Sequence, residues 1–259
     1  MLGFRIAAQT ACFAQSIKKA LHTAGEIGCN GVQIDARTEL IPSDLSETGL
    51  RQFRKMLNDL NLQVSSIAFP TRRGYADPND LQPRIEATLA AMRMASQLDS
   101  RVLIGNLGPI SDAGSDEPST TLLEALHLLA REGNRYGVRL VMQSSTSAEL
   151  LDEFVSQLPT GTMWLDLNPA RLIAQGESPA EFTSIAGRHI AHVYATDAVY
   201  DLATSQGVEV ELGRGTADFP ELLGMLEEHN YREWLTISRL ASQQPIEDCR
   251  NAVSYLRSL

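Results

Sequence analysis

HIAHVYATDAVYDLATSQGVEVELGRGTADFPEL, at residues 189–222, is the stretch that decides the fold. Its first part, Ile190 to Thr196, has the β-branched and aromatic content of a buried strand. A polar loop and a glycine turn follow. A helix is predicted to begin at Asp218, because Pro220 and Glu221 favour the first turn of a helix. The stretch therefore predicts a strand, a long polar loop, a glycine turn and a helix.

The rest of the chain alternates short apolar runs with longer amphipathic ones. Seven further runs have strand character and begin near residues 4, 31, 62, 101, 138, 162 and 234, with helical spacing between them. This alternation favours parallel strands joined by right-handed crossovers. Eight such units in 259 residues predict an α/β fold, a single (β/α)8 TIM barrel that spans residues 1–259.

Two further features bear on the type of parallel sheet. No GxGxxG or GxxxxGK[ST] motif follows the first strand, which removes the main support for an open nucleotide-binding sheet. Long loops follow predicted strands at 69–80, 106–118 and 198–217. In a barrel these loops all lie at the carboxyl ends of the strands, where binding sites are built.

The composition restricts the binding partners and the cellular compartment that we expect. The net charge is −10 and the pI about 5.0, so we expect no binding to nucleic acid or to an anionic membrane. Cys12, Cys29 and Cys249 are scattered, which disfavours both a disulfide framework and a thiolate zinc site. The N-terminal MLGFRIAAQT is poorly suited as a signal peptide, and no run of about 20 uncharged apolar residues could span a membrane. We therefore expect a cytoplasmic protein with free thiols.

Several motifs resemble the xylose isomerase-like TIM barrels, the superfamily of sugar and sugar-phosphate isomerases and epimerases. They are Asp197-Ala198, Leu212-Gly213-Arg214-Gly215 with Asp218-Phe219, and Trp234-Leu235-Thr236-Ile237. The resemblance is clearest from about residue 138 to the end. It implies an isomerase or epimerase acting on a small sugar-like molecule. It also implies a divalent metal (Zn, Mn or Mg) held by Glu, Asp, His and Glu at the ends of four late strands.

The resemblance places Gln143, Asp166, Tyr194 and Ser238 at these four metal positions. Only Asp166 retains the family residue. A divalent cation normally needs several charged or imidazole ligands, whereas the other three positions offer neutral oxygens. We therefore expect a degenerate metal site without a tightly bound metal or other cofactor. Asp35, near the end of the second strand, would add an acidic group if its strand face points into the barrel.

The resemblance also supplies the candidate site residues. Without a metal, proton transfer beside a carbonyl needs two acid/base groups, for which the candidates are Asp166, Asp197 and Tyr194. Arg214 and Arg239 are expected to face Asp166 across the barrel mouth and to form a positive site for an anionic or polyhydroxy ligand. The full set of predicted ligand-binding residues is Gln33, Gln143, Asn168, Arg214, Ser238 and Arg239.

Structural roles compete with these functional ones. His192 is predicted to be a hydrogen-bonded core histidine. Asp166 could form a salt bridge to Arg239 or Arg214, and Asp197 could simply cap the loop after it. Two functions are favoured, an isomerase or epimerase and, alternatively, a non-catalytic binding protein for a small polyhydroxy or anionic ligand. A third, a nuclease-like or other metal hydrolase, is disfavoured by the acidic charge and the missing metal ligands. The sequence does not indicate which ligand is bound or what the oligomeric state is.

Overall fold

The barrel strands form where the sequence predicts them. The computed structural model describes residues 4–111, 117–201 and 206–259. Within these ranges, eight parallel strands close into a barrel in the order β1-β10-β7-β6-β5-β4-β3-β2, and β8 pairs with β9 outside it. The predicted (β/α)8 TIM barrel is confirmed. The strands are β1 (Arg5–Gln9), β2 (Gly31–Asp35), β3 (Gln63–Ala68), β4 (Val102–Asn106), β5 (Arg139–Gln143), β6 (Trp164–Leu167), β7 (Ile190–Ala195), β8 (Asp197–Asp201), β9 (Gln206–Val210) and β10 (Trp234–Ile237).

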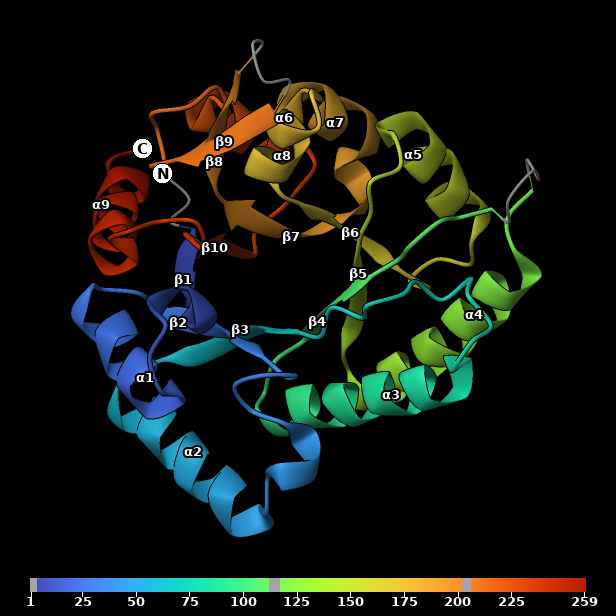
Figure 1. Cartoon of the computed structure of the whole chain (residues 1–259), viewed down its shortest axis with the longest axis horizontal. Coiled ribbons are helices and arrows are strands. Elements are labelled where there is room, and N and C mark those ends of the chain that lie inside the picture. The colour runs from blue at the N-terminus through green and yellow to red at the C-terminus, as the bar shows by residue number, and fades with distance from the viewer. Residues whose placement is uncertain (1–3, 112–116, 202–205) are drawn as a thin grey trace.

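Helices surround these strands, as Figure 1 shows. They are α1 (Ile17–Glu26), α2 (Glu47–Asp59), α3 (Leu81–Gln97), α4 (Thr120–Tyr136), α5 (Ala148–Gln157), α6 (Pro169–Ala174), α7 (Pro179–Ala186), α8 (Phe219–Glu228) and α9 (Pro245–Ser258), with the 3-10 helices η1 (Thr10–Phe13), η2 (Pro42–Asp44) and η3 (Gly187–His189). In the described part of the chain, no helix is long and apolar enough to cross a membrane.

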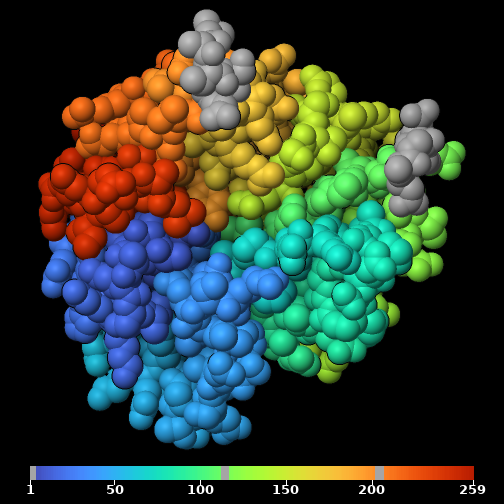
Figure 2. Space-filling view, viewed as in Figure 1, coloured from blue at the N-terminus to red at the C-terminus, as the bar shows by residue number. Residues whose placement is uncertain are grey.

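Helix starts and ring closure follow from the local sequence and the strand pairing. The Asp218 side chain accepts a hydrogen bond from the backbone N–H of Glu221, so α8 begins as predicted. Ser178 caps α7 in the same way. Parallel pairing of β1 with β10 closes the ring, and Figure 2 shows the red C-terminal segment packed against the blue N-terminal one.

The long polar loop expected at 198–217 contains secondary structure that the sequence analysis missed. β8 and β9 form an antiparallel hairpin, and α6 packs against both strands. Gly207 allows this close packing, because a Cβ atom there would lie only 2.2 Å from Cα of Ala174. The hairpin strands have five residues each, and so short an alternating pattern is hard to distinguish from a loop.

Inside the barrel, an apolar layer separates the two ends. Alternate residues of β4 and β5 belong to the main core between strands and helices, so the residues between them face inward. These inward residues form a second, smaller cluster of Val102, Ile104, Val141 and Ala191, packed with Trp164. The amino and carboxyl ends of the barrel are therefore two separate environments.

Candidate functional site

The carboxyl end of the barrel contains a cluster of hydrogen-bonded polar side chains centred on Asp166. Its Oδ1 lies 2.6 Å from Nδ1 of His192 on β7, and its Oδ2 accepts a 3.0 Å hydrogen bond from the amide nitrogen of Gln143 on β5. The side chains of Asp166 and His192 are only 1% and 2% exposed. The salt bridge suggested with Arg239 or Arg214 is wrong, because the buried partner of Asp166 is His192.

The cluster continues from His192 across the barrel. Nε2 of His192 is 2.9 Å from Oγ1 of Thr236 and 3.3 Å from the amide nitrogen of Gln33. That nitrogen also donates to Oγ of Ser66 at 2.9 Å, while the amide oxygen of Gln33 accepts a 2.8 Å hydrogen bond from Tyr194. His192 is therefore the hydrogen-bonded core histidine that was predicted. The face of β2 that carries Gln33 points into the barrel.

Tyr194 is held as a neutral phenol. Burial raises its pKa, the negative charge of Asp166 raises it further, and the hydrogen bond to Gln33 lowers it by less. The ring packs edge-on against His192, with 4.7 Å between centroids. Tyr194 can therefore donate a hydrogen bond, but it does not supply a phenolate to a cation or act as a base.

The four expected metal positions do not present ligands to a divalent cation. Gln143 directs its amide nitrogen at Asp166, Tyr194 donates its phenol proton, and Ser238 donates its hydroxyl to Oε1 of Gln9 at 2.5 Å. Across residues 4–111, 117–201 and 206–259, no group of three or more His, Cys, Asp or Glu side chains is arranged to hold a metal ion. These residues do not fit the metal that the resemblance implies. A metal-free site stays a prediction.

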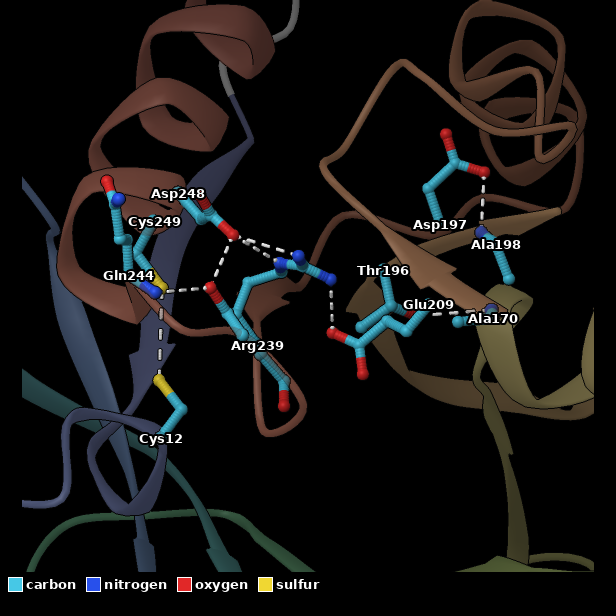
Figure 3. A network of polar contacts seen from close by, with 12 residues as sticks. Cys12, Ala170, Thr196, Asp197, Ala198, Glu209, Arg239, Gln244, Asp248 and Cys249 are labelled. Atoms are coloured by element: carbon cyan, nitrogen blue, oxygen red, sulfur yellow. Dashed lines mark hydrogen bonds and ion pairs between the residues drawn. The ribbon is translucent and has the colours of Figure 1, made fainter. Parts of the chain in front are cut away.

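Asp197 holds the loop that follows it, as part of Figure 3 shows. The side chain is buried, and each carboxylate oxygen accepts two backbone N–H groups at 2.8–3.0 Å. The donors are Ala198, Gly213, Gly215 and Ala217. The glycine turn therefore binds this internal carboxylate. These contacts favour the capping role over the predicted catalytic role, because both oxygens are committed to the loop.

Arg239 connects α9 to the β8–β9 hairpin (Figure 3). Its guanidinium lies 2.8 Å from Oε1 of Glu209 on β9 and 2.8 Å from Oδ2 of Asp248 on α9. The side chain is 10% exposed. The expectation that Arg239 faces Asp166 is wrong, because two nearer carboxylates already neutralise its charge.

Arg214 points into solvent. Its side chain is 75% exposed and pairs with Glu211 at 2.7 Å. The flanking Gly213 and Gly215 direct their amides inward to Asp197, which leaves the side chain between them on the outside. The expectation that Arg214 faces Asp166 across the barrel mouth is therefore also wrong, and the simpler interpretation of a solvated turn residue fits.

Asn168 fixes the start of α6 beside the polar cluster. Its side-chain oxygen accepts hydrogen bonds from the backbone N–H of Arg171 at 3.1 Å and from the hydroxyl of Thr196 at 2.9 Å. Asn168 is thus an N-cap residue, with Pro169 at the first helical position. This arrangement sets the first turn of α6 over the end of β6.

Arg171 is a cation at this end of the barrel that the sequence analysis missed. It lines a gap of about 10 Å³ together with Gln143, Asp166 and Asn168. Arg171 is half-buried as a residue, and within the described ranges its guanidinium has no hydrogen bond or ion pair. The Asn-Pro helix start after β6 was the available signal, because it places Arg171 in the first turn beside Asp166.

Glu39 is a second missed group at the same end of the barrel. Its Oε2 accepts hydrogen bonds from the hydroxyl of Thr10 at 2.8 Å and from the backbone N–H of Asp35 at 2.9 Å. Its Oε1 is buried and has no hydrogen-bond partner within the described part of the chain. Burial raises the pKa of this carboxyl group. No local sequence motif distinguishes Glu39 from a surface glutamate.

Comparison with known proteins gives the family. A family model described as xylose isomerase-like TIM barrel matches residues 21–259. The chain belongs to this family, as the sequence motifs indicated. No curated protein matches the chain.

Solved structures agree with this fold. A xylose isomerase domain protein from Planctomyces limnophilus is 21% identical, with a TM-score of 0.81 over 92% of this chain and 91% of that one. A xylose isomerase-like TIM barrel protein from Mycobacterium smegmatis, solved in complex with magnesium, is 14% identical, with a TM-score of 0.80 over 98% and 96%. A sugar phosphate isomerase/epimerase from Parabacteroides distasonis is 12% identical, with a TM-score of 0.75 over 100% and 95%. At these identities the likeness concerns the fold alone.

Proposed function

We propose that this isomerase/epimerase-like barrel binds a small anionic, polyhydroxy, sugar-like ligand at its carboxyl end without a divalent cation. One observation carries the proposal. Both oxygens of Asp166, the one retained family ligand, are occupied by His192 and Gln143. A buried carboxylate satisfied in this way does not need a cation.

One cation at this end, Arg171, favours an anionic ligand. The guanidinium of Arg171 has no hydrogen bond or ion pair among residues 4–111, 117–201 and 206–259, and a guanidinium is well suited to a carboxylate or phosphate group. Gln143 and Asn168 are half-buried beside it and offer amide groups to ligand hydroxyls. Gln33 and Ser238 are buried and hydrogen-bonded to other side chains of the protein, so they would act on a ligand only through their neighbours. The family resemblance and a sugar phosphate isomerase/epimerase among the similar folds support a sugar-like ligand.

A metal-independent isomerase or epimerase is the second candidate. It is favoured by the continuous row of contacts from Asp166 through His192 and Gln33 to Tyr194. Such a row can redistribute protons over several ångströms. Its weakness is burial, because these four side chains are almost entirely covered and the reacting carbon of a substrate has to reach them.

A thermal-shift screen of sugar phosphates, sugar acids and neutral sugars tests the binding function. A ligand at tens of times its dissociation constant should stabilise the protein by roughly 2 kcal/mol. We expect anionic compounds to give the larger shifts, and Arg171→Gln to lose most of them. Arg214→Gln is the matched control, since it removes the same charge from a solvated side chain. Equal loss in both variants, or no shift with any anionic compound, would overturn the proposal.

Deuterium exchange separates the two candidates. An isomerase or epimerase that moves a proton beside a carbonyl incorporates solvent deuterium at that carbon in D2O, which NMR detects directly. The binding function predicts no incorporation from any ketose or keto-acid sugar that gives a thermal shift. Incorporation that Asp166→Asn abolishes would establish the enzyme instead.

A further inference from the structure

A cavity of about 820 Å³ opens at the amino end of the barrel, on the far side of the apolar layer from Asp166. It is lined at the starts of four barrel strands by Arg5 on β1, Gln63 on β3, Arg139 on β5 and Trp234 on β10. Its volume lies within the range of roughly 300–1,000 Å³ that is usual for small-molecule sites. The family's expected site lies at the opposite end, so this cavity has no assigned role.

The charge of the cavity is opposite to that of the chain. Its lining has four guanidinium groups and two carboxylates, Arg5, Arg54, Arg101, Arg139, Asp99 and Glu233. The difference of four and two gives a local charge of +2, whereas the whole chain carries −10. A local positive potential in an acidic protein has to be created by placement of these side chains, because the composition works against it.

The two carboxylates leave part of this positive charge unpaired. Glu233 serves two arginines, lying 2.7 Å from Arg139 and 3.8 Å from Arg5. Asp99 pairs with Arg54 at 2.8 Å. Arg101 has no ion pair within the described ranges.

The walls of the cavity hold one of these cations in position. The guanidinium of Arg5 stacks 4.3 Å from the ring centroid of Trp234. Trp234 is itself buried against Gly31, where a Cβ atom would lie 2.8 Å from the indole ring. Glycine at residue 31 is thus needed for the indole to occupy this place. Arg5 is therefore presented on a fixed aromatic surface, which lowers the entropy lost when it binds an anion.

We propose that this cavity binds a small molecule with at least two negative charges, carried by phosphate or carboxylate groups. Each guanidinium offers several N–H donors in a planar fork, and the existing ion pairs use only some of them. Because the four arginines come from different elements, a molecule with two separated anionic groups contacts more of them than a single small ion does.

Calorimetric titration of the full chain with pyrophosphate and with citrate tests this site and distinguishes phosphate from carboxylate ligands. We expect at least one of them to bind the wild type, with an affinity that falls as salt rises. Arg101→Gln should weaken binding about tenfold, the loss usual for a hydrogen bond to a charged group. It removes no ion pair among the residues that the structure describes, and circular dichroism checks that the variant folds.

Two matched variants complete the test. Arg93→Gln removes the same charge from an exposed residue of α3 outside the cavity lining and should leave the affinity unchanged. Arg171→Gln removes it at the carboxyl end and should also have no effect, which separates this site from the proposed function. The proposal fails if neither anion binds, or if Arg93→Gln or Arg171→Gln weakens binding as much as Arg101→Gln does.

Discussion

Asp166 at the carboxyl end of the barrel and Arg101 at the amino end are in opposite environments. At the carboxyl end, Asp166 is buried and both of its oxygens accept internal hydrogen bonds. At the amino end, Arg101 has no ion pair among the described residues and Arg139 shares one carboxylate with Arg5. A buried charge must be satisfied inside the protein, whereas water can satisfy one at an open cavity. The retained family carboxylate is therefore satisfied from within, whereas the opposite end gathers several guanidinium groups around an open cavity.

The largest expected effect on the free energy of unfolding comes from removing Asp166 at the carboxyl end. Asp166→Ala leaves His192 and Gln143 without their buried partner and should lower the free energy of unfolding by about 3–5 kcal/mol. Urea denaturation measures this loss. The matched change at the amino end, Arg101→Gln, should cost less than about 0.5 kcal/mol, because Arg101 is exposed and has no ion pair among the described residues. If Asp166→Ala were neutral or stabilising, Asp166 would be a strained functional carboxylate and the comparison would fail.

Restoring the family's ligand types should convert the carboxyl end into a metal site. The triple variant with Gln143→Glu, Tyr194→His and Ser238→Glu offers Asp166 and three further ligands to a divalent cation. We expect manganese or zinc at about a hundred times its dissociation constant to stabilise this variant by about 2.7 kcal/mol and to leave the wild type unchanged. Calorimetry and thermal denaturation with and without chelator measure both. A comparable stabilisation of the wild type, abolished by Asp166→Ala, would contradict the metal-free site.

Removal of Asp197 tests whether this carboxylate has a structural role at the carboxyl end. Asp197→Ala removes the acceptor of four backbone hydrogen bonds and should cost about 2–3 kcal/mol of stability. Ser178→Ala removes only a helix cap and should cost about 1 kcal/mol. Denaturant titration compares the two variants. Equal effects would show that Asp197 does not hold the loop.

The smallest expected effect is a pH dependence at Glu39. Burial raises its folded-state pKa above the unfolded value, so the folded state binds the extra proton and this group favours folding at low pH. This contribution to stability is lost as the pH rises from the pKa of Glu39 in the unfolded state through its raised pKa in the folded state. Glu39→Gln should therefore become more stable relative to wild type as the pH rises from 4 to 7.5. Denaturation at both pH values measures the difference, and a constant or reversed difference would refute it.

Much of the fold was predictable because its signals are local. The strand near residue 31 and the helix start at Asp218 depend on side-chain period and capping residues a few positions apart. The same locality limited the prediction of the site. Arg239 and Glu209 are 30 residues apart, and no local pattern indicates that they pair. Both Arg239 and Arg214 were therefore assigned to the wrong carboxylate, while Arg171 was missed.

The sequence by itself determined the barrel, its strand order and the identity of Asp166 as the retained family residue. Only the tertiary structure decided what Asp166 contacts. The pairing of β6 with β7 shifts register between Leu165 and Asp166, so Asp166 lies opposite His192, whereas an unshifted register would place it opposite Ala191. Because side chains alternate across a strand, a shift of one residue changes which side chain faces the barrel interior beside it. This strand register places the Asp166 carboxylate against the imidazole of His192, at a position where the family resemblance implies a metal ligand.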